Sequence, residues 1–265
     1  MVGRVTKDEL PITHLRRYYD ALHALFEQEQ TALAELHAED PTLLIHRFRE
    51  SVKALEKVPL IEAPFYPNGR KELPSPPTPV ADIKKTHHFA SQLSDGRPRR
   101  VEGCGDALDF YYVDRELSPL RTERTNIPRR SLDLVLANAH DRTPIFAELK
   151  IRTDKLAYVA FIQVLMVALE LIVPAEGQRF RGHPPAHGLA WPQVGPFADL
   201  YLIAFEPPAT GMYREPSLQA TEDIARQLVE HSIVSQYLRR IAYLEAFADG
   251  DLSTFTCRFA FGIGV

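Results

Sequence analysis

The sequence predicts an α/β (α+β) fold in which helices flank a mixed central sheet, and two observations carry this prediction. Three strand-like segments follow one another at 108–113, 132–137 and 144–151, marked by aromatic or alternating apolar residues. A long apolar helix at 155–172 then separates them from a continuous apolar run at 200–205, which is typical of an inner strand. Two tight antiparallel connections followed by a helical crossover give a sheet of mixed direction.

The N-terminal part is predicted to be helical between residues 10 and 57. Its apolar side chains recur at spacings of three and four, namely Leu15, Tyr18, Tyr19, Leu22, Leu25 and Phe26. A second helix is expected to start at Asp40-Pro41, because Asp caps helices and Pro suits their first turn. Seven prolines then fall within 59–79, a composition typical of an extended linker. The expected parts are an N-terminal helical region at 1–58, a Pro-rich linker at 59–80 and the main domain at 81–265.

The remaining elements of the main domain are expected around this core. A short helix is expected at 82–93, before the first strand. Residues 218–247 are expected to be helical with one break near Ser232, and residues 254–262 to form the last strand. The predicted order is therefore strand, strand, strand, helix, strand, helix, strand.

Composition excludes several classes of protein. The chain of 265 residues is 45% hydrophobic and 25% charged, as in ordinary globular proteins. A formal net charge of −4 requires that any DNA-binding surface be local. Cys104 and Cys257 stand far apart, which excludes a zinc or iron–sulfur site built on cysteines and favours two reduced thiols in the core. We expect no signal peptide at the start of the chain. We also expect no membrane span, since Gln163 and Glu170 interrupt the most apolar segment. The cytoplasm is therefore the expected compartment.

The hairpin at 132–151 carries the candidate chemistry. Alternation puts Asp133 on the opposite face from its leucine neighbours, and it puts Glu148 and Lys150 together on one face of the next strand. With a four-residue loop at 139–142, Asp133 falls directly opposite Glu148. Two opposed carboxylates repel unless a shared proton or a cation neutralises them. Oxygen ligands at this spacing suit Mg²⁺ or Mn²⁺, and Lys150 can orient a water molecule or meet a phosphate oxygen.

These residues resemble a known motif. Asp133, fourteen intervening residues and then Glu148-Leu149-Lys150 look like the signature of the PD-(D/E)XK nuclease superfamily, which includes restriction enzymes, repair nucleases and exonucleases. The resemblance covers roughly residues 100 to 206, and it departs from the motif at Leu132, where the family often has Pro. It implies a restriction-endonuclease-like core. It also implies that Asp133, Glu148 and the backbone carbonyl of Leu149 bind Mg²⁺ or Mn²⁺ while Lys150 assists the nucleophile.

Other site residues follow from the same resemblance. Some exonuclease-like branches carry a catalytic Gln on the next helix with Tyr four residues later; here Gln163 is present, but Val167 takes the place of that Tyr. Gln163 either bonds to the hairpin or makes a structural hydrogen bond elsewhere in the core. Many members use a third acidic residue, and the sequence leaves Glu50, Glu116 and Glu123 open. Arginines near the motif are expected to contact DNA phosphates, or else to form a solvated face: Arg121, Arg124, Arg129, Arg130 and Arg152.

The leading functional hypothesis is a Mg²⁺-dependent nuclease that acts on DNA in restriction, defence or repair. The N-terminal helical region would add substrate contacts or a homodimer surface. The first alternative is a catalytically silent protein of the same fold that binds nucleic acid or protein. The second alternative is an unrelated α/β protein with a chance ExK sequence, in which Asp133 and Glu148 would lie apart.

Overall fold

The computed structural model describes residues 12–28, 40–58, 89–90, 93–94, 96–117, 119, 132–151, 157–172, 197–205, 216–248 and 255–263. Every structural statement below concerns these residues. The predicted linker at 59–80 lies outside them.

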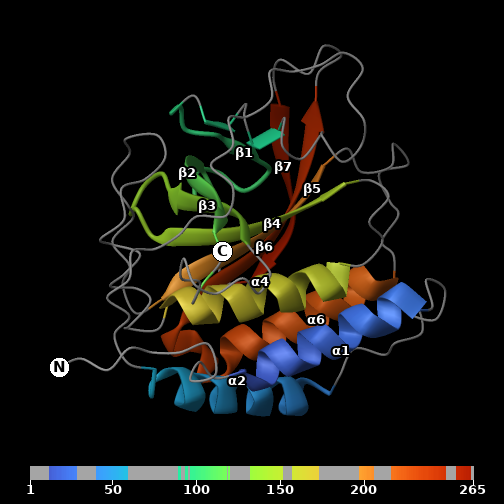
Figure 1. Ribbon diagram of the computed structural model, residues 1–265. Helices are drawn as coiled ribbons and strands as arrows, with labels where there is room; N and C mark the ends of the chain where they lie inside the picture. Colours follow the sequence, from blue (N-terminus) through green and yellow to red (C-terminus); the bar gives the residue numbers. More distant parts are fainter. Residues whose placement is uncertain are drawn as a thin grey trace.

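A single seven-stranded sheet organises the described residues, with strand order β1-β7-β6-β5-β4-β3-β2 (Figure 1). The strands are β1 (Val101–Glu102), β2 (Phe110–Leu117), β3 (Leu132–Asn138), β4 (Pro144–Ile151), β5 (Ala198–Phe205), β6 (Leu238–Ala248) and β7 (Phe255–Ile263). The pairs β2–β3, β3–β4 and β6–β7 are antiparallel, whereas β4–β5, β5–β6 and β1–β7 are parallel. The sheet is therefore mixed, as predicted, and β5 runs parallel to β4 after the intervening helix.

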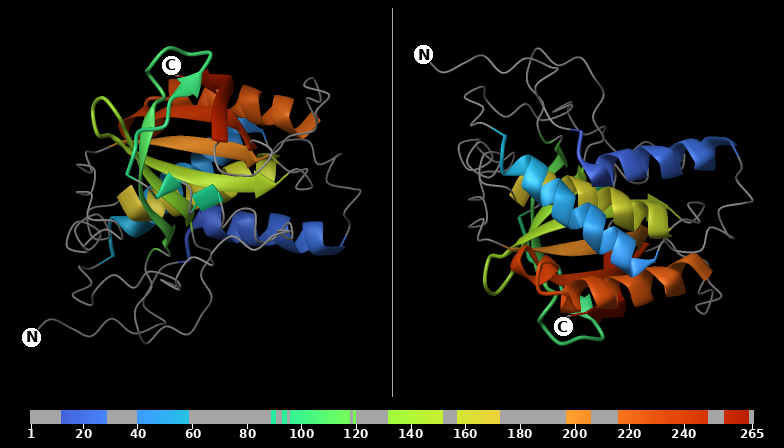
Figure 2. Two further views of the ribbon diagram at one scale, coloured as in Figure 1. Left: turned by 90° about the horizontal axis from the view of Figure 1, so that it is seen from above. Right: turned by 90° about the horizontal axis from the view of Figure 1, so that it is seen from below.

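Four long helices cover one face of this sheet. They are α1 (His14–Gln28), α2 (Pro41–Leu55), α4 (Ala157–Ile172) and α6 (Pro216–Glu230), and a short 3-10 helix, η3 (Val234–Gln236), follows α6. Seen from below, α1, α4 and α6 lie side by side in that order, and α2 crosses their outer surface (Figure 2). The predicted start of α2 is confirmed, because the Asp40 side chain accepts a hydrogen bond from the N–H of Thr42 and Pro41 begins the helix.

Two apolar clusters hold the layers together. One fills the space between sheet and helices and includes Leu15, Phe48, Phe161 and Ile241, so the N-terminal helices share the core of the sheet. The other covers the opposite face. The first layer also contains a buried ion pair in which Arg16 Nε of α1 donates to Glu170 Oε1 of α4 at 3.0 Å.

The prediction of helix over 218–247 is wrong in its second half. Helix α6 ends at Glu230, and residues 238–248 form strand β6 between β5 and β7. The residues of β6 from Ile241 to Leu244 form a continuous apolar run that local periodicity does not distinguish from a helix. Ile241 faces the helices, whereas Ala242 and Leu244 face the other cluster, which is the alternation of a strand. Of the helix expected at 82–93, the structure describes helical residues only at 89–90 and 93.

Candidate active site

The β3–β4 hairpin has the predicted register. Its paired residues run from Ala137↔Pro144 to Leu134↔Ala147, and the N–H of Asn138 donates to the carbonyl of Thr143 at 2.9 Å. One further step along the same register brings Asp133 opposite Glu148. The paired residues thus have the register expected from loop length and alternation.

The ladder between the two strands opens where the site begins. The last paired residues are Leu134↔Ala147, and the N–H of Leu149, which would continue the ladder, donates to Asp133 Oδ2 at 2.8 Å. A side-chain carboxylate thus takes the place of a main-chain acceptor. This bond holds the carboxylate of Asp133 against β4, directly beside Glu148.

Glu148 is the most unusual ionisable group of the site. Its side chain is 2% exposed, its Oε1 accepts a hydrogen bond from Lys150 Nζ at 2.9 Å, and the carboxyl of Asp133 is its neighbour. Among the described residues no donor reaches its Oε2. Burial, followed by the charge of Asp133, raises the pKa of Glu148 to about 8 although Lys150 acts in the opposite direction. With its pKa at about 8, Glu148 is mainly protonated at neutral pH when no cation is bound.

The site lies on the helix-covered face of the sheet. Glu148 is paired with Leu202 of β5 and is two residues from Phe146, and both neighbours belong to the cluster between sheet and helices. Helix α4 connects the parallel strands β4 and β5, so it starts at the end of the sheet where β4 finishes. Lys150 is 27% exposed, which shows that solvent reaches the site from this end.

The backbone also discriminates among the three acidic residues left open by the sequence. Strand β2 pairs Arg115 with Leu134 and Leu117 with Leu132, so Glu116 occupies the position opposite Asp133. Glu50, by contrast, lies on α2 and pairs with Lys53 at 2.8 Å. Glu123 lies outside the described residues. Register therefore places the backbone of Glu116 opposite Asp133. This placement depends on an irregularity between Tyr112 and Asp114 that the sequence does not signal.

Asp114 is an acidic residue that the sequence did not single out as part of the site. It is 1% exposed, it is paired with Val135, and its Oδ1 accepts the N–H of Arg115 at 2.8 Å. Because directly paired residues share a face, Asp114 lies on the same side of the sheet as Val135 and Asp133. The only sequence signal was one acidic residue directly after four apolar or aromatic residues at 110–113.

The other predicted site residues are placed as follows. Gln163 accepts a hydrogen bond from the hydroxyl of Tyr19 at 3.0 Å, so one of its partners is on α1. The five arginines predicted to contact DNA lie outside the described residues: Arg121, Arg124, Arg129, Arg130 and Arg152. No group of three or more His, Cys, Asp or Glu side chains forms a metal cluster among the described residues.

The donor set at the hairpin nevertheless fits a hard divalent cation. Asp133 and Glu148 supply carboxylate oxygens, and the ladder that would engage the carbonyl of Leu149 ends before this residue. The Oε2 atom of Glu148 is buried and has no donor within the described part of the chain, which is the situation that a cation would relieve. The residues that could hold Mg²⁺ or Mn²⁺ are therefore Asp133, Glu148 and Leu149.

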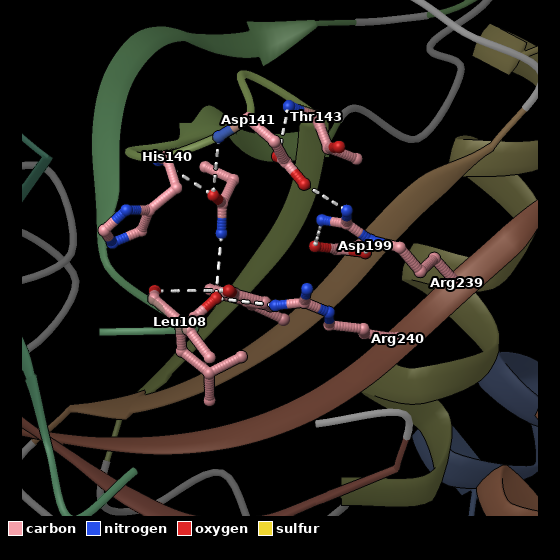
Figure 3. A network of polar contacts seen from close by, with 10 residues as sticks. Leu108, His140, Asp141, Thr143, Asp199, Arg239 and Arg240 are labelled. Atoms are coloured by element: carbon pink, nitrogen blue, oxygen red, sulfur yellow. Dashed lines mark hydrogen bonds and ion pairs between the residues drawn. The ribbon is translucent and has the colours of Figure 1, made fainter. Parts of the chain in front are cut away.

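A second polar network lies at the opposite end of the hairpin (Figure 3). Arg239 of β6 donates to both carboxylate oxygens of the fully buried Asp199, at 2.9 and 2.7 Å, and also pairs with Asp141 in the β3–β4 turn. Arg240 and Asn138 both donate to the carbonyl of Ala107, at 2.6 and 2.9 Å. These bonds fasten the turn of the hairpin to the first residues of β5 and β6, and they fix the register on which the candidate site depends.

Comparison with known proteins identified no relative. No family model, no curated protein and no solved structure matches this chain. Among the described helices, none has the length and apolar character needed to cross a membrane.

Proposed function

We propose that this protein is a Mg²⁺- or Mn²⁺-dependent nuclease of the PD-(D/E)XK type that hydrolyses phosphodiester bonds of DNA. One observation carries the proposal: a buried carboxyl group, Glu148, lies beside a second carboxyl, Asp133, and beside the ammonium group of Lys150. Such a pair requires a proton or a cation, and a cation turns it into a site for phosphate chemistry.

The arrangement of the surrounding elements supports the same proposal. From β2 to β5 the chain forms an antiparallel meander of three strands, a buried helix and a fourth strand parallel to the third. This is the order that the sequence resemblance implies around the motif hairpin. We therefore include a restriction-endonuclease-like core in the proposal, together with a cytoplasmic location and DNA as the partner.

The chain's own residues have separate tasks in this mechanism. A bound divalent cation would supply positive charge against the developing phosphoryl charge and lower the pKa of a bound water. Asp133, held in place by the N–H of Leu149, and Glu148 after loss of its proton would provide the ligand oxygens. Lys150, whose Nζ lies 2.9 Å from Glu148 Oε1, would then turn its ammonium group to a water or a phosphate oxygen.

The decisive experiment is cleavage of plasmid and single-stranded DNA in Mg²⁺, Mn²⁺ and EDTA. We expect metal-dependent cleavage by the wild type and its loss in Asp133→Ala and Glu148→Ala. Lys150→Ala should slow cleavage, by roughly 10²–10⁴-fold if Lys150 assists proton transfer or the nucleophile, and should leave metal binding intact. Glu230→Ala, an exposed carboxylate at the end of α6, is the matched control. Cleavage that persists in EDTA or in Glu148→Ala contradicts the mechanism.

The alternative function is a silent protein of the same fold that binds nucleic acid or protein. The ion pair between Lys150 and Glu148 favours it, because a lysine can neutralise the carboxyl pair without any cation. DNA or partner binding that is unaffected by EDTA, with no cleavage under any metal, would identify this function.

A further inference from the structure

The row of paired residues that contains Lys150 continues across the parallel part of the sheet. Lys150 of β4 is paired with Ala204 of β5, and Ala204 is paired with Glu245 of β6; the three strands lie side by side (Figure 1). Neighbouring strands are about 4.8 Å apart, so the backbones of Lys150 and Glu245 are about 10 Å apart with one residue between them. We call these three residues the rim row, because they lie near the carboxyl ends of their strands, where α/β sheets commonly bind ligands.

The side chains of the rim row lie on the helix-covered face of the sheet. The residue directly before each of them belongs to the apolar cluster on the opposite face: Leu149, Ile203 and Leu244. Successive side chains of a strand point to opposite faces, so the rim row faces the helices. It therefore shares its face with Glu148, which comes two residues before Lys150 on β4.

Solvent reaches the sheet at the rim row. Ala204 is the one residue of β5 that is not buried, Lys150 is 27% exposed, and Glu245 is half-buried. One row deeper, the side chain of Leu202 is buried. Ala204 offers only a methyl group, so no long side chain of β5 separates the ammonium group of Lys150 from the carboxylate of Glu245.

Binding of a cation changes what Lys150 can contact. In the structure its ammonium group donates to Glu148 Oε1 at 2.9 Å. A divalent cation on the carboxylate of Glu148 would repel this ammonium group, because like charges a few ångströms apart interact strongly where water is largely excluded. Lys150 then needs a different carboxylate, and Glu245 carries one on the same face and in the same row.

We propose that Glu245 is a positioning residue of the site: when a cation binds Asp133 and Glu148, the ammonium group of Lys150 turns across Ala204 and is held by the carboxylate of Glu245. The inference rests on the proposed function, because it needs a cation at Glu148. Glu245 thereby favours metal binding, and it keeps Lys150 at the rim until a phosphate oxygen of the substrate takes its place. The site then extends from the β3–β4 hairpin across two further strands.

The first measurement is the affinity for Mn²⁺ by titration calorimetry at physiological ionic strength. Glu245→Gln should weaken Mn²⁺ binding about three- to fivefold, which is the strength of a partly exposed ion pair. The same substitution made in Lys150→Met should weaken binding less than about twofold, because only the screened long-range field of the Glu245 charge is then lost. Thermal unfolding without metal checks that each variant is folded.

Ala204→Leu tests the path between the two side chains. It leaves both charges in place and puts a larger side chain between them, so it should weaken Mn²⁺ binding about as much as Glu245→Gln. Arg258→Met is the matched control, because Arg258 of β7 is the other residue paired with Glu245 along this row. Glu245→Gln should keep its full effect on Mn²⁺ affinity when it is made in Arg258→Met.

Cleavage gives a second readout that a purely structural role would not produce. In Glu245→Gln the Mg²⁺ concentration for half-maximal cleavage should rise by the same three- to fivefold factor. At saturating Mg²⁺ its kcat should stay within about twofold of the wild type, because Glu245 acts on the loading of the cation and not on the transition state.

The outcomes separate the two proposals. Unchanged Mn²⁺ affinity in Glu245→Gln, an equal loss with and without Lys150, wild-type affinity in Ala204→Leu, or a loss that disappears in Arg258→Met each overturn the role of Glu245 and leave the nuclease function standing. Absence of Mn²⁺ binding and of metal-dependent cleavage in the wild type overturns the nuclease function, and the positioning role falls with it.

Discussion

The buried carboxylates at the two ends of the β3–β4 hairpin have different partners. At the turn end, Asp199 is fully buried and receives two hydrogen bonds from Arg239, which oppose the rise in its pKa that burial causes. At the open end, Glu148 is equally buried, but it faces a second carboxyl, Asp133, and accepts a hydrogen bond from Lys150. The difference indicates that the turn end serves the fold, whereas the open end keeps an electrostatic conflict that a ligand can relieve.

The largest expected effect is a loss of stability when a residue at the turn end of the hairpin is substituted. Asp199→Ala should destabilise the protein by about 2–4 kcal/mol, because it leaves the arginine without its buried partner and the hairpin turn without its anchor. Urea unfolding measures the change. Asp141→Ala is the control: Asp141 is 44% exposed, so its loss should cost less than about 1 kcal/mol. Equal costs for the two variants would contradict the assignment of Asp199 as the anchor.

The next largest effect is expected on the affinity for the metal ion, which should depend on pH. The proton on Glu148 must leave before its carboxylate can bind a cation, so affinity should rise by up to about tenfold per pH unit from pH 6 to the pKa of about 8. Titration calorimetry with Mn²⁺ in buffers of different ionisation enthalpy measures both the affinity and the protons released. Binding that is insensitive to pH, or that survives in Glu148→Gln unchanged, would show that the cation binds elsewhere.

A smaller effect is expected on the stability of the metal-free protein. The pKa of Glu148 is raised from an ordinary 4.5 to about 8, so between these values the folded protein holds a proton that the unfolded chain has released. Wild-type stability should therefore fall as pH rises from about 4.5 to about 8. Glu148→Gln has no such proton to lose and should be more stable than the wild type at pH 8.5, by about 1–2 kcal/mol.

Thermal unfolding of Glu148→Gln and of the wild type at pH 5 and pH 8.5 tests the direction of this pH dependence. The two proteins should be similar at pH 5 and should differ at pH 8.5, with the variant melting higher. A variant that melts lower than the wild type at pH 8.5 would mean that the Lys150 ion pair outweighs the conflict with Asp133.

The hairpin was predictable from the sequence because its information is local. Alternation around Asp133 and Glu148 set the faces, and the loop at 139–142 set the register, which the structure shares. The position of Glu116 was not predictable, since it depends on an irregularity in β2. The hydrogen bond from Tyr19 to Gln163 was equally hidden, because it joins residues 144 positions apart that only the packed fold brings together.

The sequence did not predict strand β6, and the reason is different. From Ile241 to Leu244 its residues are apolar on both faces of the strand, so this run offers no polar side from which a period of two could be recognised. The charged residues Arg239 and Arg240 at its start resemble the polar face of a helix, yet in the structure they form the network with Asp199 and Ala107. Tertiary pairing, rather than local preference, decides the conformation of this segment.

The buried ion pair between α1 and α4 has a consequence for synthesis of the chain. Arg16 and Glu170 are 154 positions apart, and strand β1 at Val101 pairs with β7 at Cys257. Contacts of such separation slow folding, because the chain must close long loops before it gains their energy. On the ribosome, the apolar face of α1 has no α4 to cover it until most of the chain has emerged. We therefore expect truncated nascent chains that end before α4 to bind chaperones through α1, and release to follow once the partner helix is available.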